Sequence, residues 1–139
     1  MTLRFEELAV GQAIPVSSRA VTREDVRAYA DASGDRNPLH LDDEVARAAG
    51  FPGIIAHGMF TMGHLVSTLV DWVGDPDALR RIRVQFRAPV FVGETIVAGG
   101  TVRQLDPSDR TVVLDVWVSV ERDGETEWPI RRSEAELRL

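Results

Sequence analysis

The feature that most restricts the fold is a run of apolar residues at helical spacing between Gly58 and Val73. The apolar side chains recur every three or four positions, and they are Met59, Met62, Leu65, Val66, Leu69, Val70 and Val73. Because this apolar face is broad, we expect the helix to be largely buried. Gly74, Asp75 and Pro76 are expected to end it. A single buried helix of this kind needs a sheet to cover it.

After this helix the hydrophobic period changes to two, which is typical of strands. The four expected strands cover residues 81–87, 95–105, 111–121 and 125–139. Residues 106–109 and 122–124 have the composition of hairpin turns. Consecutive strands indicate an antiparallel meander, so the sequence predicts an α+β domain in which an antiparallel sheet wraps around a long central helix. We see no internal repeat or linker and expect residues 1–139 to form a single domain.

The first part of the chain is expected to hold one short strand and two helices. Alternating polarity over residues 16–21 predicts the strand. Thr22, with an acidic residue three positions later, resembles a capping box and predicts a helix that ends near Ser33. Asp42 is expected to cap a second, shorter helix that ends at Gly50.

Composition excludes several classes of function. The net charge of −6 argues against non-specific nucleic-acid binding, which depends on basic residues that neutralise phosphates. The absence of cysteine excludes disulfides, a thiolate nucleophile and cysteine-ligated metals. The N-terminal residues do not read as a signal peptide, and the apolar stretches are too short to cross a membrane. We therefore expect a cytoplasmic protein that binds neither nucleic acid nor membranes.

The loop after the first helix carries side chains suited to acid–base chemistry. Asp35 provides a carboxylate and His40 an imidazole. Between them, Asn37 can hydrogen-bond its own backbone and Pro38 fixes φ, so this segment cannot continue the helix after Gly34. Taken alone, the loop is also explained as an ordinary helix exit.

The start of the central helix adds a second feature. Gly58 follows His57 at the point where the helical pattern begins, so the Gly58 N–H is expected to be an unpaired donor of a helix N-terminus. Such a donor can hold a developing oxyanion. A carboxylate, an imidazole and an oxyanion donor together indicate chemistry beside a carbonyl group.

These residues resemble the signature of the MaoC-like (R)-specific enoyl hydratases and dehydratases, which have the hot dog fold. The stretches that carry the resemblance are Tyr29-x-x-x-Ser33-Gly34-Asp35-x-Asn37-Pro38-Leu39-His40, Ala56-His57-Gly58-Met59, Trp72-Val73-Gly74-Asp75-Pro76 and Val84-x-Phe86. Within the family, the chain is most similar to the catalytic β subunits of actinobacterial (3R)-hydroxyacyl-ACP dehydratases. The resemblance implies a hydro-lyase that acts on acyl thioesters of coenzyme A or acyl carrier protein and needs no cofactor.

The resemblance also assigns roles to individual residues. Asp35 and His40 would hold the reactive water, with Asp35 as the base in hydration and His40 as the proton donor, and the reverse reaction exchanges these roles. Which residue moves which proton stays open at this point. The Gly58 N–H would bind the thioester carbonyl. Asn37, Pro38 and His57 are expected to brace the loop and the helix entrance.

Four alternatives compete with this assignment: two remain open and two are not expected. A hot dog thioesterase and a non-catalytic acyl-binding partner subunit both remain open. A metal site formed by His40, His57 and His64 is not expected, because His57 and His64 lie seven residues apart, or about 10 Å along a helix. Ser67 lacks the glycine-flanked setting of a serine nucleophile.

Arginines gather in the first strand after the central helix. Arg81, Arg83 and Arg87 are candidates to meet the phosphates of coenzyme A or an acidic carrier protein, although the same residues also fit a solvated strand face. A single helix cannot fill both faces of a meander, so we expect a dimer. It is either a homodimer or a heterodimer with a related hot dog subunit. Acyl chain length and pathway are left open.

Overall fold

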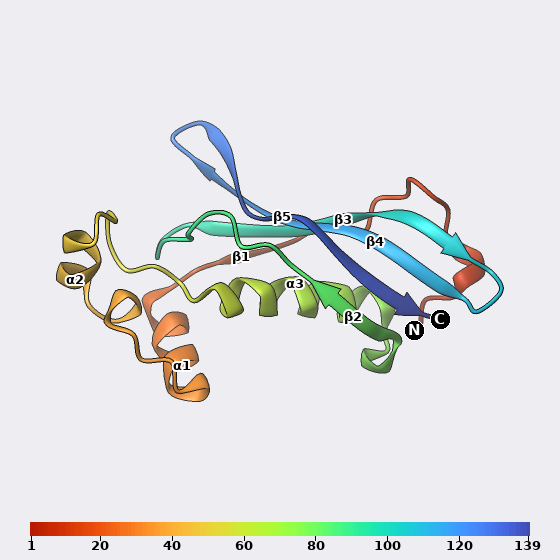
Figure 1. Ribbon diagram of the computed structural model, residues 1–139, viewed down its shortest axis with the longest axis horizontal. Helices are drawn as coiled ribbons and strands as arrows, with labels where there is room; N and C mark the ends of the chain where they lie inside the picture. Colours follow the sequence, from red (N-terminus) through yellow and green to blue (C-terminus); the bar gives the residue numbers. More distant parts are fainter.

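The five strands form one antiparallel sheet in the order β1-β3-β4-β5-β2, and a long helix lies along one face of it (Figure 1). The computed structural model describes residues 1–139. The strands are β1 Ser17–Ala20, β2 Leu79–Arg83, β3 Thr95–Asp106, β4 Thr111–Arg122 and β5 Glu125–Arg138. The helices are α1 Arg23–Ser33, α2 Asp43–Ala48 and α3 Gly58–Val73, with short 3-10 turns η1 Phe5–Glu7, η2 Pro38–His40 and η3 Pro76–Ala78.

The sheet confirms most of the predicted meander and corrects one strand. β3, β4 and β5 pair with one another in chain order, as expected. β2 does not lie beside β3; it pairs with the far side of β5, and β1 takes the place beside β3. The sequence predicts strands from local alternation, and this local signal does not determine which strands become neighbours.

β2 is also shorter and begins earlier than the predicted strand over residues 81–87. Beside it, β5 carries a bulge, because Val116 pairs with Ser133 whereas Val118 pairs with Ile130. Past the end of β2, the Gln85 N–H donates to the Ser133 side chain instead of to a strand carbonyl. Regular pairing therefore stops, and Phe86 returns to the sheet only through an isolated bridge to Ile130.

The predicted helix boundaries agree with the structure. Thr22 caps α1, and Asp25 and Thr22 exchange hydrogen bonds as a capping box does. Asp42 caps α2 through two backbone N–H groups. Gly74 ends α3 with a left-handed φ of 78°, a conformation that glycine adopts without steric cost.

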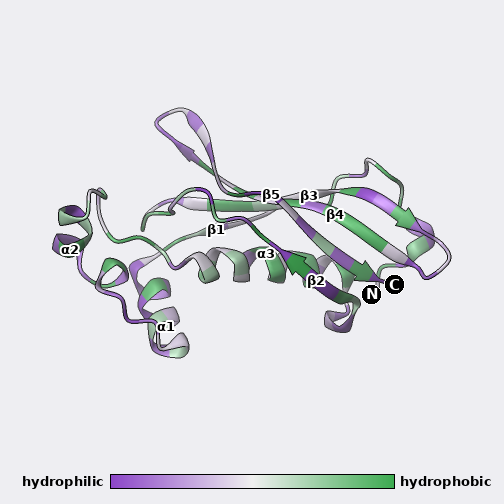
Figure 2. Cartoon of the chain, viewed as in Figure 1, coloured by the Kyte–Doolittle hydropathy of each residue, from purple (hydrophilic) through white to green (hydrophobic).

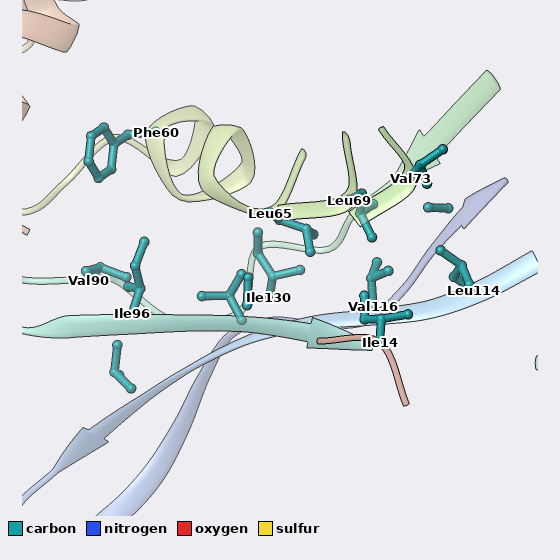
Figure 3. Packing of buried hydrophobic residues seen from close by; sticks show 14 of the residues in the cluster. Ile14, Phe60, Leu65, Leu69, Val73, Val90, Ile96, Leu114, Val116 and Ile130 are labelled. Carbon is teal, nitrogen blue, oxygen red and sulfur yellow. The ribbon is translucent and has the colours of Figure 1, made fainter. Parts of the chain in front are cut away.

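The core lies between α3 and the sheet. In Figure 3, Leu65, Leu69 and Val73 extend from α3 towards side chains of the strands, and these three are at most 1% exposed. Hydrophobic and hydrophilic residues alternate along β5, as expected for a sheet with one buried face (Figure 2). No helix is both long and apolar enough to cross a membrane.

The expectation that α3 is largely buried is wrong in part. Met59 is 54% exposed, and Met62, Val66 and Val70 are only half-buried. The sheet covers one side of the helix, so the other side of its broad apolar surface stays accessible.

Candidate active site

The loop between α1 and η2 holds Asp35 through its backbone and one carboxylate oxygen. The Asp35 N–H donates to Ser33 Oγ at 3.1 Å, and its carbonyl accepts from His57 Nε2 at 2.9 Å. Oδ1 accepts the Asn37 N–H at 3.3 Å. The Asn37 side chain in turn accepts the Leu39 N–H at 3.1 Å, which is the turn-forming contact expected of it. Oδ2 is thereby left to face His40.

His40 is oriented by a backbone carbonyl on the other side of the site. Its Nδ1 lies 2.7 Å from the carbonyl oxygen of Ile55, and since a carbonyl only accepts, Nδ1 carries the hydrogen. Nε2 therefore points towards the reaction centre, 4.0 Å from Asp35 Oδ2. This separation is too long for a direct hydrogen bond, but one water molecule can bridge it. The His40 side chain is 12% exposed and that of Asp35 is 55% exposed.

His57 forms the floor beneath both groups. It is 2% exposed, its ring stacks on His40 with centroids 3.8 Å apart, and Tyr29 packs against it at 4.8 Å. Its Nε2–H holds the Asp35 carbonyl, while Nδ1 has no hydrogen-bond partner. This hydrogen bond joins the start of α3 to the Asp35 loop, and the bracing role of His57 stays a prediction.

Gly58 opens α3 directly beside this pair. As the first helical residue, it has an N–H with no acceptor inside the helix. A cavity of about 330 Å³ joins it to His40. The other lining residues are Ile55, Ala56, Thr61, Phe86, Arg87, Ala88, Pro89, Val90 and Pro129. A Cβ on Gly58 would stand 3.2 Å from the Phe86 ring, so glycine permits this ring to approach the helix start closely.

An ion pair fixes the loop that forms one wall of the cavity. Arg122 donates to both carboxylate oxygens of Glu94 at 2.8 Å and to the Pro89 carbonyl at 3.0 Å, and it lies over the Phe91 ring at 4.5 Å. The hydrogen bonds to Glu94 raise the pKa of Arg122 above its usual value. In this loop, the Val90 carbonyl accepts a hydrogen bond from the Ala56 N–H at 2.8 Å. The ion pair therefore supports the segment that leads into Gly58.

The structure separates the three arginines proposed for carrier binding. Arg83 and Arg81 both approach Glu134, at 2.6 and 3.5 Å, and neither lines the cavity. Arg87 does line it, and its Nη1 donates to Gln85 Oε1 at 3.0 Å. Of the three, only Arg87 is brought together with the acid–base pair.

Asp35, His40 and His57 lie close enough together to raise the question of a metal site, with one ligand atom from each within 4.8 Å of the others. The two imidazole rings are stacked with only 23° between their planes. A metal–nitrogen bond lies in the plane of its ring, so the lone pairs of stacked rings run side by side and do not converge on one ion. His64, the third histidine, instead holds the Ser17 carbonyl of β1 at 3.0 Å.

Sequence reasoning missed part of the cavity wall. Phe86 belongs to the motif Val84-x-Phe86, but no sequence pattern indicates that its ring covers Gly58, and Pro129 comes from the distant strand β5. Tyr29 stood in the loop motif without a role, and it supports His57. Contacts of this kind depend on where β5 and α3 meet, which local patterns do not encode.

A curled antiparallel sheet around one long helix, with an acid–base pair at the helix entrance, is the arrangement of a hot dog protein with a site for acid–base chemistry. The family described as "MaoC like domain" matches residues 6–123, and the chain belongs to it. A 3-hydroxybutyryl-CoA dehydratase from Methylorubrum extorquens is 34% identical over 119 residues, which cover 85% of this chain and 75% of that protein.

Two further relatives are matched over very different shares of their own length. A peroxisomal enoyl-CoA hydratase 2 from Arabidopsis thaliana is 46% identical over 67 residues, or 47% of this chain, and the match spans only 22% of that protein. The solved structure of an (R)-hydratase from A. caviae involved in PHA biosynthesis superimposes with a TM-score of 0.86 at 27% identity. That match covers 96% of this chain and 98% of the hydratase.

Proposed function

We propose that this chain catalyses the (R)-specific hydration of 2-enoyl thioesters and the reverse dehydration of (3R)-3-hydroxyacyl thioesters. The observation that carries the proposal is the 4.0 Å separation between Asp35 Oδ2 and His40 Nε2, next to the cavity that reaches Gly58. Relatives named as hydratases and dehydratases of acyl-CoA substrates support the same reaction. The thioester handle is coenzyme A or an acyl carrier protein.

Each part of the site matches a requirement of the reaction. A water molecule between Asp35 and His40 is positioned to add to the β-carbon of the enoyl group. As its oxygen adds, negative charge moves to the thioester oxygen, where the Gly58 N–H at the start of α3 stabilises it. The site then delivers a proton to the α-carbon, and dehydration reverses these steps.

The hydrogen bonds restrict where protons are exchanged. His40 Nδ1–H is held by the Ile55 carbonyl, so proton transfer takes place at Nε2. With Asp35 as the base in hydration, His40 is the proton donor and donates from Nε2. Asp35 Oδ1 is held by the Asn37 N–H, which leaves Oδ2 to accept the proton from water.

The test follows the loss of the conjugated enoyl absorbance with crotonyl-CoA and longer enoyl thioesters. Asp35→Asn and His40→Ala should each lower kcat/KM by about 10²- to 10⁴-fold. Their effects should be far from additive, because both side chains serve one water. Asp31→Asn is the matched control, since it removes a 58% exposed carboxylate nearby that pairs with Arg36, and it should keep full activity.

The outcome distinguishes this reaction from its competitors. A thioesterase would instead release one free thiol for each enoyl thioester consumed and yield the free 2-enoic acid, whereas hydration yields a 3-hydroxyacyl thioester and no thiol. The assignment would be overturned if the wild-type protein is inert on every thioester, both alone and together with a related hot dog subunit.

We also propose that the active form is a dimer, either of this chain or with a related hot dog subunit. Met59, which follows Gly58 in the chain, is 54% exposed. Phe86, whose ring lies against Gly58, is 52% exposed. The accessible side of α3 continues this apolar surface, and β2 is a free sheet edge. A second subunit on this side would enclose the cavity. Light scattering tests the dimer, and a fully active monomer would contradict it.

A further inference from the structure

The outer face of the sheet, opposite α3, carries an aromatic and cationic groove that the proposed reaction does not use. It has a volume of about 350 Å³. Its lining residues are Asp115, Val116, Trp117, Trp128, Arg131, Arg132 and Ser133. Trp117 stands between the buried core residues Val116 and Val118 on β4, so strand alternation places its side chain on the outer face.

The groove is built on a flat aromatic surface. The Trp117 indole lies directly over Gly99 of β3, where a Cβ would stand only 2.4 Å from its ring. Trp128 meets Trp117 edge to face, with centroids 5.6 Å apart and planes at 87°. Together the two indoles form a corner in which a flat ring can stack on one and touch the edge of the other.

A bulge in β5 brings two consecutive arginines to this corner. Val116 pairs with Ser133 and Val118 with Ile130, so Trp117 faces both Arg131 and Arg132. Consecutive strand residues normally point to opposite faces, but both arginines line the groove. Arg132 has a φ of 52°, a conformation unfavourable for a residue with a Cβ. Unfavourable backbone conformations of this kind concentrate at binding sites.

Both guanidinium groups are available for a ligand. Arg131 lies over the Trp128 ring at 4.6 Å, and neither Arg131 nor Arg132 is within ion-pair distance of a carboxylate. The carboxylate of Asp115, which also lines the groove, is bound by Arg103 at 2.7 Å. The free charge of the groove is therefore positive within a chain of net charge −6.

We propose that this groove binds a nucleotide, with the base stacked on the tryptophans and the phosphates bound by Arg131 and Arg132. Indole platforms stack any base, and arginine binds phosphate through paired hydrogen bonds. The volume is within the range of small-ligand sites. Free nucleotides and the nucleotide part of coenzyme A share this chemistry. The proposal does not depend on the hydratase reaction.

The experiment is a titration of the full chain with ADP, followed by tryptophan fluorescence and by calorimetry. ADP should quench the emission saturably with a Kd below about 1 mM, whereas adenosine or inorganic phosphate alone should bind at least about tenfold more weakly. Trp72→Phe removes the one tryptophan outside the groove and should leave the quenching intact.

Two variants test the arginines. Arg132→Gly removes the charge at a backbone conformation that glycine prefers, so the fold is kept, and it should weaken ADP binding about tenfold. Arg131→Ala should act in the same direction. Arg80→Ala is the matched control, because it removes an equal charge from an exposed arginine of β2 that has no ion pair and does not line the groove.

The results decide the proposal in either direction. Absence of saturable binding at about 10 mM ADP, or equal weakening by Arg80→Ala, would overturn it and leave the tryptophans as a cover for Gly99. Titration with coenzyme A and with 4′-phosphopantetheine, which lacks the nucleotide, separates the two sources. Binding of coenzyme A that depends on Arg132 and is at least about tenfold tighter than binding of ADP would identify the coenzyme as the source, whereas equal binding of the two would identify the shared nucleotide alone.

Discussion

Replacing Arg122 by alanine should destabilise the protein far more than replacing Arg103, an exposed arginine that forms two ion pairs. Arg122 and Glu94 are 24% and 16% exposed, and Arg122 also holds the Pro89 carbonyl. Alanine leaves the Glu94 carboxylate partly buried without its partner. Fully buried pairs cost about 3–5 kcal/mol to break and exposed pairs under about 1 kcal/mol, so we expect a loss of about 2–3 kcal/mol here.

The matched control is Arg103→Ala, which removes contacts to Asp115 and Glu134 on the outer face of the sheet. Arg103 is 47% exposed, so its loss should cost about 1 kcal/mol or less. For a chain of this length, the Arg122 variant should lower Tm by about 6–12 °C and the Arg103 variant by at most about 4 °C. Both are measured by circular dichroism during heating.

Salt provides a second readout of the same difference. In 1 M salt the effect of Arg103→Ala should shrink, because salt ions screen exposed charges, whereas the effect of Arg122→Ala should persist. The Arg122 variant should also lose hydratase activity below its Tm, since the loop that it holds forms a wall of the cavity. Equal losses of Tm in the two variants would refute the argument from burial.

Two further predictions concern the core and the response to acid. Leu65→Ala removes a side chain with 0% exposure and should cost about 2–5 kcal/mol, whereas Ser67→Ala on the exposed side of α3 should stay within about 0.5 kcal/mol, as chemical denaturation can measure. The hydrogen bond from Arg103 lowers the pKa of Glu134 from 4.5 to about 2. A lowered carboxylate pKa stabilises the fold above the unfolded value, so stability should fall as the pH drops from about 4.5 towards 2. Glu134→Gln should flatten the Tm curve in that window, and an unchanged slope would contradict the assignment.

Much of the fold could be predicted from the sequence, because the signals are local. The capping residues Thr22 and Asp42 bind N–H groups two or three positions away, and Gly74 ends α3 through its own φ. The order of elements and the pairing of β3, β4 and β5 follow from periodicity and short turns. The same holds for the loop that positions Asp35, whose turn contacts lie within a few residues.

The candidate site was predicted as a set of residues, and the structure decided its geometry. Sequence spacing put Asp35, His40 and Gly58 in one set. The 4.0 Å gap between the first two depends on contacts between segments far apart in the chain. His57 holds the Asp35 carbonyl across 22 positions, and the Ile55 carbonyl orients His40 across 15. Periodicity carries no information on such contacts.

By itself, the sequence determined the helices, their caps, most strands and the residues able to perform acid–base chemistry, because each depends on interactions within a few positions of the chain. Only the tertiary structure decided that β2 joins β5, that one side of α3 stays accessible, and that Arg87 lines the cavity while Arg83 pairs with Glu134. These outcomes depend on which surfaces meet when the sheet curls around the helix. That choice minimises the free energy of the whole chain, and no single segment specifies it.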